Sequence, residues 1–127
     1  MTLNTHLKID QTLNGKVLEL REGFAKIALQ TTTIMIADEQ GLVHGGFVFG
    51  AADFCAMACV NDPFVVLAKS ETKFLAPVKV DEVIIFEGTI TNRDGKRATV
   101  EVRASIDEKK VFVGTFYTAV LEKHVLS

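Results

Sequence analysis

The stretch that decides the fold is Gly41–Val60, GLVHGGFVFGAADFCAMACV. It opens with a glycine-rich loop around one histidine and turns into an apolar run that Asn61-Asp62-Pro63 ends. The run from Phe47 to Val60 predicts a helix that is apolar almost all round, and such a helix is wrapped by other elements rather than lying on a surface. Asp53 is the one carboxylate inside the run.

A carboxylate at this place needs an explanation. Asp is a poor residue in a helix interior and is costly to bury without a partner. Its neighbours at helical spacing cannot pair with it; they are Phe49, Gly50, Ala56 and Met57. Asp53 therefore faces a cleft or meets polar groups of a second subunit, and burial would raise its pKa toward the range of a general base. The alternative is an Asp held by backbone donors in a structural network.

The segments around this helix have strand patterns. Lys16–Arg21 and Phe24–Gln30 predict a hairpin across Glu22-Gly23, with Leu18 and Leu20 on one face of the first strand. Thr31–Asp38 leads into a loop. Four further strands are expected after Pro63, over Phe64–Leu75, Glu82–Thr91, Arg97–Ile106 and Val111–Leu121. A hairpin, a buried helix and four antiparallel strands predict one α+β domain over residues 1–127, with residues 1–14 as a short N-terminal helix or arm.

Composition excludes several classes of protein. The net charge is −2 with dispersed basic residues, and there is no Trp and one Tyr, which argues against nucleic-acid binding. No apolar run is long enough to cross a bilayer and no signal pattern opens the chain, so we expect a cytoplasmic protein that does not bind membranes. Cys55 and Cys59 lie one helical turn apart and are expected to be buried, reduced thiols rather than metal ligands.

Three short motifs carry a family resemblance. They are Val43-His44-Gly45-Gly46, Ala52-Asp53 six residues later, and Phe74-Leu75-Ala76-Pro77-Val78. Together they resemble the PaaI-type acyl-CoA thioesterases of the hotdog-fold superfamily, over roughly residues 14 to 122. The resemblance implies an antiparallel sheet of five to six strands wrapped around one long central helix.

The resemblance also implies roles at a site shared by two subunits. Asp53 would act on the thioester carbonyl as base or nucleophile, and the Gly45 N–H of the partner subunit would form the oxyanion hole. His44 would orient the loop and contact the thioester, unless it is a loop histidine bonded to backbone. Asp38 stands where relatives often carry Asn, which puts a carboxylate in place of an amide donor.

The resemblance names a ligand and an assembly as well. The acyl-CoA ligand would lie along Gly46 and Phe47, and Lys73, Arg93 and Arg97 would meet the coenzyme A phosphates. No further cofactor is implied. Because the site needs two subunits, we expect a homodimer, or two dimers paired into a tetramer.

Two alternatives stay open. A MaoC-type enoyl-CoA hydratase would need an Asp and a His separated by four residues, whereas five lie between Asp38 and His44. The other alternative is a non-catalytic regulator that binds acyl-CoA and acts through a protein partner. Asp38 in place of Asn is the feature that favours it.

Overall fold

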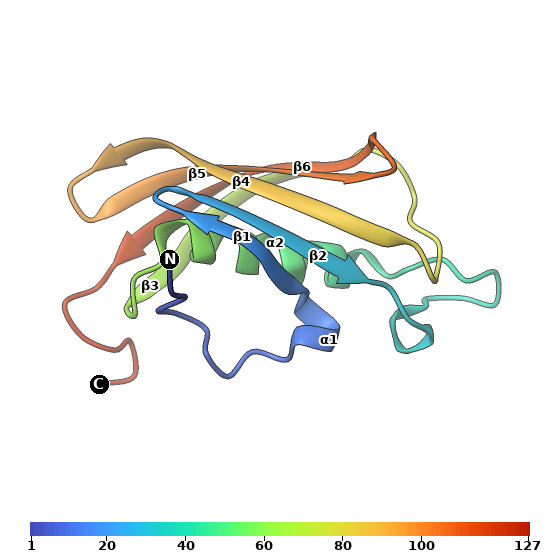
Figure 1. Cartoon of the computed structure of the whole chain (residues 1–127), viewed down its shortest axis with the longest axis horizontal. Coiled ribbons are helices and arrows are strands. Elements are labelled where there is room, and N and C mark those ends of the chain that lie inside the picture. The colour runs from blue at the N-terminus through green and yellow to red at the C-terminus, as the bar shows by residue number, and fades with distance from the viewer.

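The structure, a computed structural model, describes residues 1–127 as one six-stranded antiparallel sheet and one long helix (Figure 1). The sheet order is β1-β2-β4-β5-β6-β3. The helices are α1 (Gln11–Asn14), the 3-10 helix η1 (Thr33–Met35) and α2 (Gly45–Val60). The strands are β1 (Lys16–Arg21), β2 (Phe24–Gln30), β3 (Val65–Phe74), β4 (Val83–Asp94), β5 (Arg97–Ile106) and β6 (Lys109–Val120). The expected hotdog arrangement is confirmed.

Helix α2 begins two residues earlier than its apolar run predicts. His44 is its N-cap residue in an extended conformation, with φ −64° and ψ 131°, so that Gly45 and Gly46 form the first turn. The expected end is correct, because Asn61 adopts the left-handed conformation that closes helices, with φ 54°. The two glycines have low helix propensity, which is why the run alone placed the start at Phe47.

The N-terminal segment covers the side of α2 that faces away from the sheet (Figure 1). Residues 1–10 form an extended arm, and α1 follows with Asp10 as its N-cap. The Asn14 side chain lies 3.3 Å from where a Cβ on Gly50 would stand. Sheet on one side and arm on the other explain how a helix without a polar face is buried, as its sequence predicts.

The sheet side of α2 packs tightly on the inner faces of β4 and β5. The residues of β5 expected to face inward are buried; they are Val100, Val102, Ala104 and Ile106. Cys55 and Cys59 are free, buried thiols, as expected. Glycine is required at position 88, because a Cβ there would lie 2.7 Å from the Cys59 sulfur. The pKa of the Cys55 thiol is raised well above its usual value, mainly by a hydrogen bond with Cys59 and also by burial.

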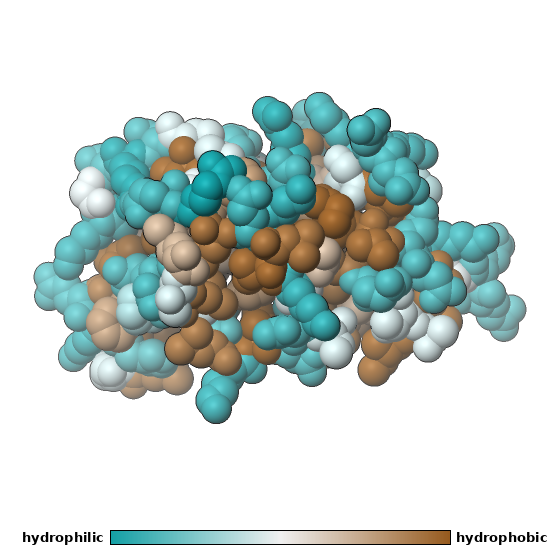
Figure 2. Space-filling view, in the orientation of Figure 1, coloured by the Kyte–Doolittle hydropathy of each residue, from teal (hydrophilic) through white to brown (hydrophobic).

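The expected faces of β1 are wrong at Leu18. The pairing of β1 with β2 shifts between Val17 and Glu19, so Leu18 falls in a bulge and leaves the inward face that Leu20 keeps. Leu18 is 56% exposed as a result. Figure 2 shows apolar surface across the middle of the face on which β1 lies, and Leu18 and Val83 are among the exposed apolar residues.

Strand β3 is one edge of the sheet and pairs only with β6. Exposure alternates over part of β3, because Lys69, Glu71 and Lys73 are exposed and Ser70 and Thr72 are half-buried, but Phe74 at the end of the strand is 55% exposed. Pro77 follows the end of β3 by three residues, in keeping with its inability to donate to a ladder. No helix of the chain is both long and apolar enough to span a membrane.

Candidate active site

The N-terminus of α2 has no cap. The His44 side chain makes no capping hydrogen bond, and the N–H groups of Gly45 and Gly46 have no acceptor within the chain. The loop is nevertheless fixed, because the His44 N–H donates to the Met35 carbonyl at 2.9 Å. Free N–H groups at a helix N-terminus carry positive partial charge and attract a developing oxyanion. Such a terminus therefore suits the chemistry expected of Gly45.

Gly45 approaches β3 closely at this terminus. A Cβ on Gly45 would stand 3.2 Å from Cε2 of Phe74. The Phe74 ring also makes an edge contact with Phe112, with ring centroids 5.2 Å apart at an angle of 73°. Glycine at position 45 thus leaves room for the aromatic ring beside the exposed N–H groups.

Asp53 lies within the same helix, and its Oδ1 is buried without a hydrogen-bond partner. No other buried side-chain nitrogen or oxygen lacks one. Removal from water raises the pKa of the Asp53 carboxyl from 3.8 to about 6. In the structural alternative, backbone N–H groups would donate hydrogen bonds to Asp53. Its Oδ1 receives none, so that alternative does not fit. A carboxyl with a pKa near 6 can accept and return a proton at neutral pH.

Gly45 and Asp53 cannot act on one atom within a single chain. Eight residues of helix separate them, which corresponds to roughly 12 Å along the axis. A reacting carbonyl must lie about 3 Å from both its oxyanion donor and the group that attacks it. The two groups serve one reaction only if each comes from a different subunit.

A cleft of about 370 Å³ opens beside Gly45. No lining side chain carries a charge; the lining residues are Leu42, Val43, Gly45, Val48, Phe74, Leu75, Ala76, Pro77, Val78 and Val111. Its walls are joined by a hydrogen bond from the Val43 N–H to the Val78 carbonyl at 2.8 Å. This size falls within the range of small-molecule sites. The cleft can hold an apolar group whose polar end lies at the helix terminus.

The other residues predicted around Gly45 lie at the helix terminus or in the loop before it. The His44 ring is exposed and stands edge-on to Phe47 at 6.2 Å, and it lies 3.0 Å from where a Cβ on Gly46 would stand. Asp38 has a loop-forming role, because its Oδ1 accepts hydrogen bonds from the N–H groups of Gln40 at 2.9 Å and Leu42 at 3.1 Å. Asp38 is exposed in that loop, whereas Asp53 lies two turns into α2.

The three predicted basic residues lie at different ends of the sheet. Lys73 precedes Phe74 and is exposed, but it lies on the opposite face of β3 from Phe74, which pairs with the buried Phe112. Arg93 and Arg97 flank the β4–β5 turn, and Arg93 lies 3.7 Å from Glu22 in an exposed ion pair. Phe112, which contacts Phe74, pairs with Ala104, and seven residues of β5, roughly 23 Å, separate Ala104 from Arg97. Arg93 and Arg97 therefore lie far from Gly45 of their own chain.

Sequence reasoning missed most of the cleft lining. Val111 and Leu42 gave no local signal, because the contacts that place them join segments more than thirty residues apart, such as Leu42 with Lys79. The Phe74–Val78 segment was noticeable only as a family motif. No group of three His, Cys, Asp or Glu side chains lies close enough together to hold a metal ion.

Comparisons with known proteins place this geometry in a family. The family described as "Thioesterase superfamily" matches residues 40–113. A methylthioribose-1-phosphate isomerase of Aquifex aeolicus is 47% identical over 121 residues, which cover 95% of this chain and 26% of the isomerase. A transcription factor FapR of Caldanaerobacter subterraneus is 25% identical over 113 residues, which cover 88% of this chain and 56% of FapR. The chain thus spans a quarter to somewhat more than half of these relatives.

Solved structures agree with the fold. The uncharacterized protein PH1136 of Pyrococcus horikoshii is 45% identical with a TM-score of 0.99, over 100% of this chain and 98% of PH1136. A hypothetical thioesterase of Streptococcus pneumoniae, crystallised with coenzyme A, is 20% identical with a TM-score of 0.78, over 87% of this chain and 88% of that one. A mutant of the phenylacetic acid degradation protein PaaI of Thermus thermophilus is 24% identical with a TM-score of 0.80, over 87% and 96% of the two chains. With its family match, its sheet wrapped around one helix and its open helix terminus, the chain belongs to the thioesterase superfamily.

Proposed function

We propose that the protein hydrolyses acyl-CoA thioesters at a site formed by two copies of the chain. The buried, unpartnered Oδ1 of Asp53 carries this proposal. A buried carboxylate without a partner is costly, and a place in catalysis explains why it is kept. The free N–H groups of Gly45 and Gly46 supply the complementary charge.

The reaction follows from these groups. Asp53 of one subunit removes a proton from water, and the hydroxide oxygen bonds to the thioester carbonyl carbon. The carbonyl oxygen becomes an oxyanion that the Gly45 N–H of the partner subunit stabilises. The C–S bond then breaks, and the coenzyme A thiolate takes the proton back from Asp53. In a second route the Asp53 carboxylate itself attacks the carbonyl carbon, and the C–S bond breaks to give a mixed anhydride and the coenzyme A thiolate. Water then hydrolyses the anhydride to the free acid and the Asp53 carboxylate, and the thiolate takes up a proton released in this step.

A dimer through the free edge of β3 would join the two halves of the site. Antiparallel pairing of two β3 edges places the Phe74 end of one chain beside the Val65 end of the other. That arrangement also turns Arg97 of the partner subunit toward the end of the sheet where Gly45 lies. Large apolar side chains around the helix terminus are exposed in the single chain, which is typical of a surface that a partner subunit covers; they are Ile34, Ile36, Leu42, Phe74 and Leu75.

The coenzyme A bound to the Streptococcus thioesterase supports an acyl-CoA ligand. Lys73, Arg97 of the partner subunit and Arg93 are the proposed phosphate contacts. The chain matches only 26% of the Aquifex isomerase, which is too little to carry that activity over.

The test is thiol release from a panel of short, long and aromatic acyl-CoAs. Asp53→Asn keeps the shape of the side chain and should lower kcat/KM roughly a hundredfold to ten-thousandfold, because the general base is lost. The wild-type kcat/KM should rise with pH through about 6 and then level off, since the carboxylate is the active form. Glu19→Gln, an equally conservative change on the exposed edge strand β1, is the control and should leave turnover unchanged.

The shared site is tested separately by the solution mass. We expect at least a dimer at micromolar concentration, and a stable monomer that still turns over acyl-CoA would disprove the two-subunit mechanism.

A second candidate is an acyl-CoA-binding protein without turnover. The similarity to part of the transcription factor FapR favours it, together with Asp38 at the position where relatives carry Asn. Acyl-CoA binding without thiol release from any member of the panel would support this candidate over hydrolysis.

A further inference from the structure

The cleft beside Gly45 is lined almost entirely by apolar side chains. Eight of its ten lining residues are hydrophobic, and none of the ten side chains is charged. The free N–H of Gly45 lies at the helix-terminus end of the cleft. An acyl group whose carbonyl oxygen meets this N–H would extend its chain along side chains of which none is charged.

Phe74 forms the wall of this cleft nearest the helix terminus. The residue is 55% exposed, yet its ring contacts both Phe112 and the first turn of α2. The contact of its Cε2 with the Cβ position of Gly45, at 3.2 Å, puts the ring next to where the thioester would lie. The ring therefore limits the space available to the first carbons of an acyl chain that enters the cleft.

We propose that Phe74 determines the size of the acyl group and that the cleft accepts uncharged, apolar acyl chains. This inference rests on the proposed acyl-CoA ligand. A chain that ends in a carboxylate would bury that charge among apolar side chains without a partner, which is far more costly than burying a methyl group. A chain that is too bulky would collide with a ring that Phe112 prevents from moving inward.

Binding of thioether analogues tests the inference without any need for hydrolysis. S-hexyl-, S-(2-ethylbutyl)- and S-(5-carboxypentyl)-CoA would be titrated calorimetrically against the wild type, Phe74→Leu and Phe74→Ala. The wild type should bind S-hexyl-CoA at least about a hundredfold more tightly than the carboxypentyl analogue, because the two differ only in the buried charge. The ethylbutyl chain has as many carbons as the hexyl chain but is branched at its second carbon. Phe74→Ala should therefore raise the affinity for the ethylbutyl analogue relative to the hexyl one about tenfold or more, and Phe74→Leu by less.

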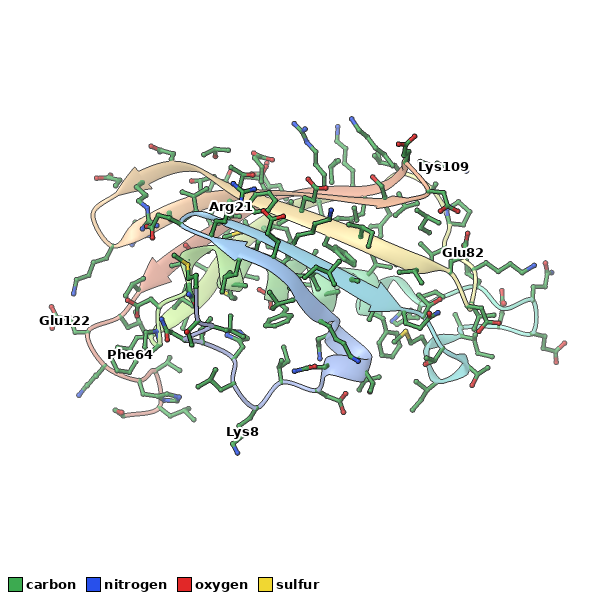
Figure 3. All side chains as sticks on the ribbon, in the orientation of Figure 1. Lys8, Arg21, Phe64, Glu82, Lys109 and Glu122 are labelled. Atoms are coloured by element: carbon green, nitrogen blue, oxygen red, sulfur yellow. The ribbon has the colours of Figure 1, made fainter.

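Leu18→Ala is the matched control. Leu18 is 56% exposed on β1, the edge strand opposite β3, and Arg21, the last residue of β1, is labelled in Figure 3. This variant should keep the wild-type ratio of affinities. If the hexyl-to-ethylbutyl ratio is the same in all Phe74 variants, or shifts equally in Leu18→Ala, the role of Phe74 is refuted. If Phe74→Ala does not fold, Phe74→Leu decides.

The same analogues separate this inference from the proposed function. Thioether binding with the expected ratios, but no hydrolysis of hexanoyl-CoA, would refute the thioesterase and keep the acyl selectivity. Hydrolysis of hexanoyl-CoA and adipoyl-CoA at equal rates would keep the thioesterase and refute the apolar selectivity. Absence of binding to any analogue would refute both.

Discussion

The two ends of helix α2 are built in opposite ways. At the C-terminal end Asn61 donates its N–H to the Met57 carbonyl at 2.8 Å, and its amide group both accepts from the Asn4 N–H at 2.6 Å and donates to the Thr2 carbonyl at 2.9 Å. At the N-terminal end no side chain caps the helix, and two N–H groups have no acceptor. One end anchors the arm to the helix, and the other is left open.

The comparison shows that helix α2 is less stable at its N-terminal end than a capping side chain would make it. Ser, Thr, Asn or Asp at an N-cap typically stabilises a helix by about 1 kcal/mol, and His44 provides no such hydrogen bond. A capping side chain would occupy the N–H groups that a ligand needs. The buried, unpartnered oxygen of Asp53 destabilises the same helix a second time. Both destabilising features are thus groups to which we assign a role in the reaction.

Of changes at the two ends of the helix, removing the open N–H should have the largest effect. Gly45→Pro deletes the proposed oxyanion donor, and proline suits the first position of a helix, where His44 before it already has the extended conformation that proline requires. We expect kcat to fall roughly a hundredfold to a thousandfold. Gly45→Ala is the control, because it makes the same Cβ contact with Phe74 and keeps the N–H. Equal losses in both variants would mean that crowding against Phe74, and not the missing donor, is responsible.

Asp53→Asn should change how stability depends on pH. The folded pKa of about 6 lies above that of the unfolded chain, so the folded state binds more protons between pH 4 and 6, and wild-type stability falls as pH rises through this window. The cost at neutral pH is about 3 kcal/mol, from about 1.4 kcal/mol for each tenfold change in the proton equilibrium. Urea denaturation at pH 4 and pH 7 should show the variant gaining this amount relative to wild type at the higher pH. A constant difference at both pH values would contradict a buried, ionisable Asp53.

Opening the closed end should have the smallest effect, and only on stability. Asn61→Gly preserves the left-handed conformation, φ 54°, but loses both side-chain hydrogen bonds to the arm. We expect a loss of about 1–2 kcal/mol in the free energy of unfolding, measured by urea denaturation, with kcat/KM unchanged. A large fall in kcat/KM in folded Asn61→Gly would show that the arm contributes to the site.

Sequence patterns predicted the parts of this molecule that are local. The apolar run around Asp53 gave the helix, the alternation over β5 gave its inward face, and the spacing between His44 and Asp53 gave the family. The bulge at Leu18 was missed, because a bulge depends on the register with β2 and not on the residues of β1 alone.

The carboxylate at the centre of the site could be predicted from the sequence, but the residues and contacts around it could not. Asp53 was noticeable because it contradicts its apolar surroundings, and the burial of its unpartnered oxygen agrees with that reasoning. The contact between Phe74 and Gly45 joins residues 29 positions apart and has no sequence pattern of its own. The remoteness of Arg93 and Arg97 from Gly45 could not be foreseen either, since it depends on which end of each strand meets the helix terminus.

The place of β3 in the sheet has a consequence for how the chain is made. β3 directly follows α2, yet its pairing partner is β6, the last strand, and Val65 is opposite Val120. While the ribosome is still adding β4 and β5, the nascent chain therefore holds a strand with both edges unpaired and an apolar helix beside it. Such species aggregate readily, and the sheet is complete only after β6 has emerged. Loss of the final strand would thus remove the pairing partner of β3 as well as β6 itself.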